Sequence, residues 1–475
     1  MHFVRMQGCK SSWSCAVVEW MAVLEFLGSV WWLIVSLGVL VTFHEFGHYW
    51  VARRCGVRVL RFSVGFGRSL WSRRGRDGTE WVIAAIPLGG YVKMLDEREG
   101  EVPAEQLDQA FNRKSVWKRI AIVVAGPVAN LLLCVALLWA MFVVGRPDWR
   151  PMVGNVEGIA AEAGLARGDT VRAVGERATP TWGELQMALL PAALDRSDVE
   201  LRVEDANGRE LRRTLALSKL PDEIDDRLLL GRIGLTPRHA LLPAVIGQVS
   251  PGTPADGVLR DGDRILALDG RRIEWFDDIG PQVQALGARG GHAMIEVQRD
   301  GERYALPMAP ELANDGRGGR YWRLGIAPAP SEVPAKDAVQ RYGPVAAVPA
   351  AIREGWYQTR QLFAMVGRAF DGRVAVQNTI GGPVTIARTA NAYAQLGPAW
   401  FLTVLALLSL SLGILNLLPI PLLDGGHLLY YLIELAKGSP LSDRAMAAGQ
   451  YVGLALLAGL MGLAFYNDIV NNFIR

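Results

Sequence analysis

The stretch His44-Glu45-Phe46-Gly47-His48 decides how the rest of the chain is interpreted. Histidines at positions i and i+4 lie on one face of a helix, so their imidazoles can share a metal ion. The glutamate between them cannot take the same ligand position, but it can accept a proton from water that the metal activates. The pentapeptide ends a hydrophobic stretch at about 24–44, where ionisable side chains are costly and usually functional. The sequence therefore predicts a metal site at membrane depth. The alternative is a helix end at which two histidines meet water.

Length and composition indicate a membrane protein with a large extramembrane part. The chain has 475 residues, too many for one hydrophobic core, so several domains are expected. Hydrophobic residues make up 51% and the mean hydropathy is +0.18, values between those of soluble proteins and of pure membrane bundles. A net charge of +3 gives no reason to expect nucleic-acid binding. The 4 cysteines contain no C-x-x-C pair, so we expect no disulfide framework.

Three further hydrophobic stretches are predicted to cross the membrane, at about 120–144, 399–418 and 446–466. Arginines follow the first span and lysines precede the second. Because basic residues favour the cytoplasmic side, the metal motif is predicted to face the cytoplasm. Residues 1–20 are interpreted as an N-terminal extension outside the fold.

Residues 57–95 alternate like strands and are punctuated by glycines, which predicts a cytoplasmic β-hairpin. The segment 86–92, with Gly89 and Gly90, is apolar enough to re-enter the membrane if its backbone is buried in protein. An extended edge beside a metal site can pair with an extended substrate. The alternative is a hairpin without a role in the reaction.

The second predicted span contains the small residues and proline of the segment 125–129, followed by Asn130. Small residues permit close helix approach, and an amide in the membrane needs a partner. We expect Asn130 to tie helices together, and the alternative is a direct role in stabilising the oxyanion or positioning the substrate.

Residues 150–330 change in composition and contain an internal repeat. Gly168-Asp169 recurs 94 residues later as Gly262-Asp263, each time before a strand pattern. The two units, each of about 90 residues, resemble PDZ domains, which bind peptides by β-addition. The alternative is that they cover the membrane portal without binding a specific peptide.

Residues 336–372 form an amphipathic pattern typical of a helix on the membrane surface. The loop from Asn378 to Pro383 follows, as a substrate guide or as a simple connector. The third span then ends in 416–427, N-L-L-P-I-P-L-L-D-G-G-H, whose prolines and glycines break the helix at membrane depth. Irregular backbone there is tolerated only inside protein or beside a water-filled cavity.

The acidic residue of this break, Asp424, is predicted to lie at the same membrane depth as His44 and His48. A carboxylate with two imidazoles completes a three-ligand site that keeps one position open for water. Zinc suits this donor set, although iron or cobalt fit similar ligands. His427 is interpreted as a neighbour of the site, because a fourth ligand would close it.

Together these motifs resemble the bacterial site-2 proteases, intramembrane zinc metalloproteases of family M50. The resemblance covers about residues 21–470, and it departs from the family at Gly381-Gly382-Pro383, where Ser-Gly-Pro is expected. It implies Zn²⁺ held by His44, His48 and Asp424, with Glu45 as the base. Asn416, near Asp424 in sequence, is a candidate for stabilising the oxyanion.

The resemblance implies a multi-pass α-helical membrane protein with four transmembrane helices, a membrane-associated β-hairpin and two tandem periplasmic PDZ domains. It places the chain in the bacterial inner membrane, with the active site near the cytoplasmic side. The expected domain boundaries are 1–20, 21–50, 51–115, 116–148, 149–238, 239–330, 331–396, 397–430 and 431–475.

The implied substrates are a membrane-bound anti-sigma factor, cut in its transmembrane helix after another protease has removed its outer domain, and remnant signal peptides. The expected partners are therefore a transmembrane peptide and membrane lipid, and no nucleic acid. The PDZ pair is expected to exclude uncut substrates by size. The hairpin around Gly89 and Gly90 and the loop from Asn378 to Pro383 are expected to hold the unwound substrate strand.

Two other classes of protein are alternatives to a protease. A catalytically inactive scaffold that displays PDZ domains would more naturally lack Glu45 or one of the ligands. A metal transporter would line a route with polar residues, whereas here they cluster at one depth.

Overall fold

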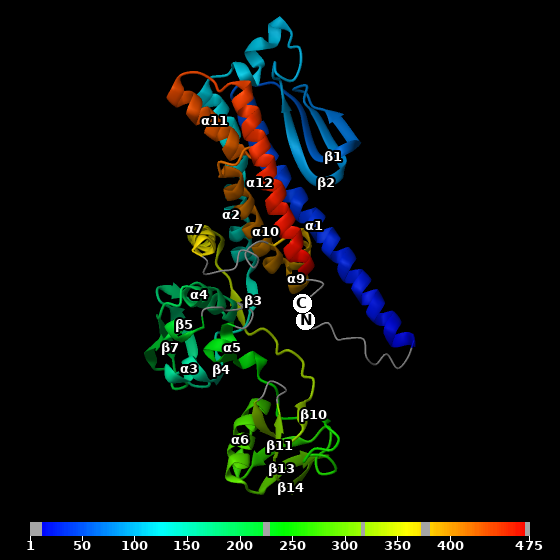
Figure 1. Ribbon diagram of the computed structural model, residues 1–475, viewed down its shortest axis with the longest axis vertical. Coiled ribbons are helices and arrows are strands. Elements are labelled where there is room, and N and C mark those ends of the chain that lie inside the picture. Colours follow the sequence, from blue (N-terminus) through cyan, green and yellow to red (C-terminus); the bar gives the residue numbers. More distant parts are fainter. Residues whose placement is uncertain (1–11, 222–228, 315–318, 372–380, 471–475) are drawn as a thin grey trace. The chain divides into compact units, whose positions relative to one another are not determined.

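The computed structural model describes residues 12–221, 229–314, 319–371 and 381–470. These residues form two compact units (Figure 1). The helical unit comprises the residues up to 146 and from 341 onward, and the β-rich unit comprises residues 147–340.

The helical unit contains the long helices of the chain and one β-hairpin. Its helices are α1 (Ser12–Arg54), α2 (Val116–Val144), α7 (Pro344–Phe370), α9 (Pro383–Leu396), α10 (Pro398–Leu417), α11 (Asp424–Lys437) and α12 (Asp443–Ile469), and its strands are β1 (Val59–Arg74) and β2 (Glu80–Met94). Short 3-10 turns, η1 (Ala104–Gln109) and η2 (Phe111–Arg113), precede α2.

Helix α2 is central, because it packs against α1, α7, α10 and α11. Its buried residues include Cys134, Leu138, Met141 and Phe142, which form a core with alanines of α7 and α10. The helix that the sequence marks with small residues is therefore the one on which the others pack.

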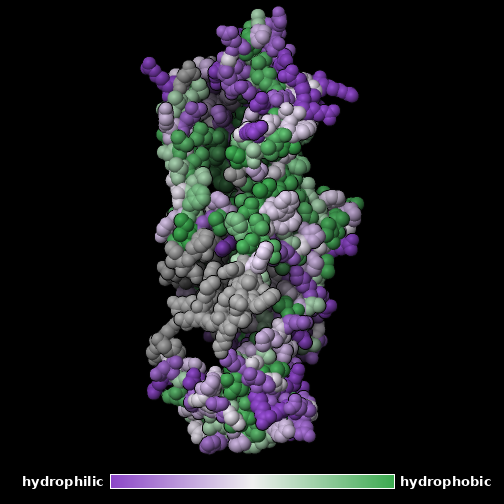
Figure 2. Space-filling view, turned by 90° about the vertical axis from the view of Figure 1, so that its right-hand side faces the viewer, coloured by the Kyte–Doolittle hydropathy of each residue, from purple (hydrophilic) through white to green (hydrophobic). Residues whose placement is uncertain are grey.

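Among the described residues, 4 helices are long and apolar enough to cross a membrane: Trp20–Arg54, Val116–Val144, Pro398–Leu417 and Arg444–Ile469. Many of their large hydrophobic side chains are exposed, including Leu132 at 66% and Val452 at 64%. Figure 2 shows hydrophobic side chains gathered over the middle of the helical unit on the visible face, with hydrophilic ones at its end. Exposed apolar surface of this extent fits a lipid-facing bundle. The four predicted spans are confirmed as helices of this kind.

Helix α1 continues ten residues past the predicted end of the first span at His44, to Arg54. Arg53 and Arg54 in its last turn interact favourably with the negative end of the helix dipole. Gly56, with φ 76°, then adopts the left-handed conformation that commonly follows a helix end. The metal motif therefore lies inside the helix rather than at its end.

The predicted hairpin is present, but its strands are long and bent. Residues 59–64 of β1 pair with 90–94 of β2, residues 61–64 pair in addition with 80–83, and residues 69–74 pair with 80–84. Asp77, between the strands, accepts hydrogen bonds from Tyr49 of α1 (2.9 Å) and from Thr79 (2.8 Å). This contact ties the hairpin to the helix that carries the metal motif.

Helix α11 was not expected from the sequence, which placed a domain boundary at 430/431. It begins at Asp424 after the non-helical connection 418–423. Lys437 in its last turn and Gly438 in the left-handed conformation are the usual signals of a helix end. The break in the third span is thus a link to a further helix.

The β-rich unit contains two lobes, which we name by their residues: the first lobe, 149–238, and the second lobe, 239–330. The first lobe holds β4 (Val153–Val156), α3 (Gly158–Glu162), β5 (Thr170–Val174), β6 (Arg177–Ala178), α4 (Trp182–Leu194), β7 (Val199–Glu204), β8 (Glu210–Leu215), α5 (Leu229–Ile233) and β9 (Leu235–Pro237). The second holds β10 (Ile246–Val249), β11 (Arg264–Leu268), β12 (Arg271–Arg272), α6 (Ile279–Arg289), β13 (Ala293–Arg299), β14 (Glu302–Met308), β15 (Glu311–Asn314), β16 (Arg320–Arg323) and β17 (Ile326–Pro328). Strands β3 (Arg146–Asp148) and β18 (Ala338–Gln340) form a separate two-stranded sheet.

Each lobe has its own hydrophobic core, and the two sheets have matching strand orders, β6-β5-β7-β8 and β12-β11-β13-β14. The pairing is irregular between Val171 and Ala173 in the first sheet and between Ile265 and Ala267 in the second. These positions differ by 94 residues, the same offset as the repeated Gly-Asp pair. The repeat in the sequence therefore corresponds to a repeat in strand order and in register.

Candidate metal centre

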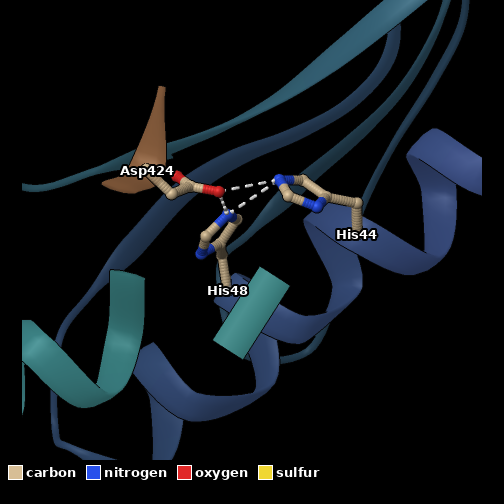
Figure 3. A group of neighbouring side chains, drawn as sticks. All are labelled: His44, His48 and Asp424. Carbon is tan, nitrogen blue, oxygen red and sulfur yellow. Dashed lines mark hydrogen bonds and ion pairs between the residues drawn. The ribbon is translucent and has the colours of Figure 1, made fainter. Parts of the chain in front are cut away.

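Three side chains from two distant parts of the chain converge at one point (Figure 3). Asp424 Oδ2 lies 3.1 Å from His44 Nε2 and 3.4 Å from His48 Nε2. The two Nε2 atoms lie 3.2 Å apart. Both histidines are buried, at 9% and 8% exposure. The structure thus brings together the three residues that the sequence proposes as ligands.

The geometry of these three atoms fits a zinc ion. Zinc bound tetrahedrally at about 2.0–2.1 Å keeps its ligand atoms about 3.3 Å apart, close to the 3.1, 3.2 and 3.4 Å found here. Asp424 Oδ2 is also buried without a hydrogen-bond partner among the described residues. Two imidazole nitrogens and a carboxylate oxygen aimed at one point need a cation or protons between them.

The orientation of His48 leaves the correct nitrogen for a metal. Its Nδ1 lies 2.8 Å from the backbone oxygen of Ile122 in α2. A carbonyl only accepts, so Nδ1 carries the proton and donates it, and Nε2 keeps a free lone pair. Such a partner for the second ring nitrogen is usual for metal-binding histidines.

Asn130 plays the corresponding part for His44. Its side chain is fully buried, and its amide lies 3.2 Å from His44 Nδ1. Asn130 Oδ1 has no hydrogen-bond partner among the described residues. Half a turn of the amide, whose oxygen and nitrogen occupy equivalent places, puts Oδ1 against Nδ1–H and satisfies both groups. The structure therefore places the Asn130 amide against His44, and the Asn130 backbone oxygen also accepts from Ser409 of α10 (2.8 Å).

Two glycines allow α1 and α2 to approach closely enough for these contacts. A Cβ on Gly47 would lie 2.3 Å from the backbone oxygen of Ala125. A Cβ on Gly126 would lie 2.3 Å from His48 Nε2 and 2.9 Å from His44 Cε1. Gly47 thus sets the helix crossing, and Gly126 provides the wall against which both imidazoles rest.

Asp424 is placed by a strained and tightly packed connection. Leu422 has φ 83°, a conformation that is uncommon outside glycine and costs of order 1–3 kcal/mol. Cβ atoms on Gly425 and Gly426 would lie 2.0 Å and 2.5 Å from the backbone oxygens of Leu418 and Ile420. The Asp-Gly-Gly sequence therefore lets the chain fold back on itself and start α11 with the carboxylate facing the histidines.

Glu45 of α1 lies beside strand β2. A Cβ on Gly90 would lie 3.2 Å from Glu45 Cγ. Gly89 is covered by the ring of Phe66, because a Cβ on this glycine would lie 2.2 Å from Phe66 Cε2. The two glycines therefore serve close packing, one beside the glutamate and one beneath an aromatic ring.

The other candidate residues are less closely tied to the ligands. Asn416 lies in the last turn of α10, and no hydrogen bond joins it to the three ligands in the described structure. Pro383 is the first residue of α9, which Figure 1 shows at the end of the helical unit opposite α11. Asn378 lies outside the described residues. His427 is exposed and is not one of the three converging residues.

Sequence reasoning missed one buried ion pair near the site. Arg119 of α2 donates to both carboxylate oxygens of Glu434 of α11, at 3.1 and 2.7 Å. Helical periodicity places Arg119 on the same face of α2 as Ile122, Gly126 and Asn130, and this was the available signal.

Comparison with known proteins agrees with this site. The model of peptidase family M50 matches residues 32–460. A "putative zinc metalloprotease" of Xylella fastidiosa (strain 9a5c) is 54% identical over 446 residues, 94% of this chain and 99% of the relative. The "Regulator of sigma-E protease RseP" of Escherichia coli (strain K12) is 40% identical over 450 residues, again 94% and 99%. A "putative zinc metalloprotease" of Vibrio cholerae is 37% identical over 441 residues, 92% and 97%. The chain belongs to peptidase family M50 and is a zinc metalloprotease.

Proposed function

We propose that this chain is a site-2 protease that cuts single-span membrane proteins within the membrane, with zinc held by His44, His48 and Asp424. The observation that carries the proposal is that three candidate ligand atoms converge, and that two of them, with Glu45 between them in sequence, come from a helix apolar enough to span a membrane. A metal site for soluble substrates would have no need of such surroundings.

The residues divide the work of hydrolysis between them. Bound zinc supplies a nucleophile at neutral pH by acidifying water, and it polarises the scissile carbonyl. Glu45, one position after the first ligand, accepts the proton of the attacking water and returns it to the leaving amine. Asn130 and the Ile122 carbonyl hold the imidazoles in the orientation that leaves both Nε2 atoms free.

A helical substrate hides its carbonyls in its own hydrogen bonds, so it must unwind before attack. Residues 90–94 of β2 pair with β1 on one side, and on the other side they pair with no strand among the described residues. Since Gly90 adjoins Glu45, an unwound substrate that pairs with this edge would present its backbone to the base. This supports a positioning role for Gly89 and Gly90. For Asn416, Asn378 and Pro383, a role in oxyanion stabilisation or substrate positioning rests on the family resemblance.

The two lobes of the β-rich unit are proposed as tandem PDZ domains that exclude substrates whose outer domain is intact. Their matching strand order and register irregularity support a repeated domain. The name of the Escherichia coli relative, a regulator of sigma-E protease, supports an anti-sigma factor as substrate. Remnant signal peptides are a second substrate class, and neither class involves nucleic acid.

The proposed setting is the bacterial inner membrane, with membrane lipid around the four spans. Arg53 and Arg54 end α1, and Arg113, Lys114 and Lys118 surround the start of α2. By the positive-inside rule we expect these ends to face the cytoplasm, and we therefore propose a metal centre near the cytoplasmic side and a periplasmic β-rich unit.

The test is cleavage of a model single-span substrate by the purified full chain and by Glu45→Gln, with zinc measured in both. The proposal expects cleavage by the wild type only, and about one zinc per chain in both proteins, because Glu45 is not a ligand. Equal cleavage by both would refute the assignment of the base. Retained zinc in His48→Ala would refute the ligand set.

A further inference from the structure

One face of α2 carries contacts to both helices that bear the candidate ligands, α1 and α11. Asn130 contacts His44, the Ile122 carbonyl accepts from His48, and Gly126 lies against both rings. Arg119 extends this face by one turn and reaches α11, the helix that begins with Asp424. The spacing of 3, 4 and 4 residues from 119 to 130 is that of a single helical face.

Arg119 and α11 are joined by a buried, bidentate ion pair. The guanidinium donates to both Glu434 oxygens, and the two side chains are 7% and 13% exposed. The guanidinium carbon also lies 4.8 Å from the centre of the Tyr431 ring. Its Nε donates to the backbone oxygen of Lys114 at 3.1 Å. The Arg119 guanidinium thus donates hydrogen bonds from all three of its nitrogens and lies over the Tyr431 ring. A bidentate ion pair fixes the orientation of the two side chains as well as their distance.

Beyond the tightly packed connection that precedes Asp424, the support of α11 comes mainly from α2. That connection is non-helical and strained at Leu422. Tyr431 stands seven residues after Asp424, within about 20° of the same face. Glu434 lies about 15 Å along the axis from Asp424, so a tilt of about 4° moves Asp424 by about 1 Å. Metal–ligand distances tolerate about 0.2 Å.

We propose that Arg119 is a positioning residue for the third metal ligand: its contacts with Glu434 and Tyr431 hold α11 so that Asp424 meets His44 and His48. This inference rests on the ligand set of the proposed function. Arg119 touches no reacting atom, and it acts on the reaction only through the affinity of the site for zinc.

The test measures zinc affinity of the full chain in detergent, by competition with a fluorescent chelator, for wild type, Arg119→Lys and Glu434→Gln. Lysine keeps the positive charge but cannot donate two parallel hydrogen bonds to the carboxylate. Glutamine keeps the shape of glutamate but loses its negative charge. Both variants are expected to bind zinc about 10–100-fold more weakly, the usual effect of removing a group that orients a ligand. Excess zinc is expected to restore cleavage.

A matched control is available in a second bidentate pair. Arg113 donates to both oxygens of Glu97, at 2.7 and 3.0 Å, but this pair is exposed and does not touch α11. Arg113→Lys is expected to leave zinc affinity unchanged.

The outcomes separate positioning from simple stabilisation. Unchanged zinc affinity in both Arg119→Lys and Glu434→Gln would overturn the proposal, whether or not the zinc-free proteins unfold at lower temperature. Should Arg119→Lys fail to fold, Glu434→Gln decides alone. A wild type that binds no zinc would instead refute the proposed function, and so the two failures are distinguishable.

Discussion

Replacing Gly126 by alanine tests the placement of both histidines at once. The new Cβ would lie 2.3 Å from His48 Nε2, 2.6 Å from His48 Cε1 and 2.9 Å from His44 Cε1. The alanine methyl group would therefore press on the ligand atom itself and on the second ring. The change adds one methyl group within a helix, where alanine is otherwise the more favourable residue.

The size of the effect follows from these distances. Relief of the clash requires His48 to move by at least about 1.1 Å, the difference between 2.3 Å and an ordinary contact of 3.4 Å. That is about five times the deviation that metal–ligand distances tolerate, about 0.2 Å. Losing one of three protein ligands leaves only a weaker two-ligand site, so Gly126→Ala is expected to bind zinc at least about 100-fold more weakly.

The assay is zinc content after dialysis against a chelator, followed by cleavage of a single-span substrate. Gly38→Ala is the matched control, because a Cβ on this glycine of α1 meets no atom within 4 Å. Circular dichroism and size-exclusion chromatography check that both variants are folded. If folded Gly126→Ala retains wild-type zinc content and cleavage, the imidazoles do not rest on Gly126 and the described site is wrong.

Three further predictions concern the supports of the site and of the fold. Asn130→Leu removes the partner of His44 Nδ1, so chelator competition should show zinc bound about 10–100-fold more weakly. Asn130→Asp keeps an acceptor and should lie closer to wild type; equal affinities of all three would contradict the assigned contact. Asp468 of α12 accepts from the backbone N–H groups of Gly382, Val384 and Thr385 at the start of α9 (3.2, 2.7 and 3.2 Å), so Asp468→Ala should lower the free energy of unfolding in detergent by about 2 kcal/mol. Asp468→Asn should lower the free energy of unfolding less. An unchanged free energy of unfolding in Asp468→Ala would contradict a stabilising role of Asp468 at the start of α9. In the second lobe, burial raises the pKa of the Asp263 carboxyl, but Arg299 and the backbone N–H of Arg260 more than offset this and hold it below its ordinary value. The stabilisation is therefore present above the unfolded pKa of about 4 and is lost as pH falls through the folded one. Hydrogen-exchange protection of this lobe should be lower in Asp263→Asn than in wild type at pH 7, by about 3 kcal/mol, and the gap should narrow below pH about 4; a gap independent of pH would contradict the ionic origin.

The sequence was most informative where local chemistry leaves few choices. Hydrophobic length identified the four spans, and the histidine spacing indicated two candidate ligands, which the fold brings together with Asp424. Asp424 could be proposed because an Asp-Gly-Gly break at membrane depth is hard to explain without a site. The repeat offset of 94 residues recurs in the register of the two sheets.

Contacts between distant segments were less accessible. Hydrophobicity alone ends the first span at His44 because the histidines are polar, whereas packing against α2 and the hairpin extends the helix to Arg54. Helix α11 was not predicted, because the prolines and glycines around its start are typical of a broken helix rather than of a new one. No local pattern could pair Arg119 with Glu434, which lies 315 residues away. Asn130 was expected to join helices, and only the fold shows that its amide contacts His44.

The most direct test of the account is zinc X-ray absorption spectroscopy on the full chain in detergent, loaded with one zinc per chain. The account predicts only nitrogen and oxygen ligands at about 2.0–2.1 Å, with outer-shell scattering from two imidazoles, and loss of one light ligand in Asp424→Ala. Sulfur scattering at about 2.3 Å, the absence of an imidazole signal, or an unchanged spectrum in Asp424→Ala would contradict it.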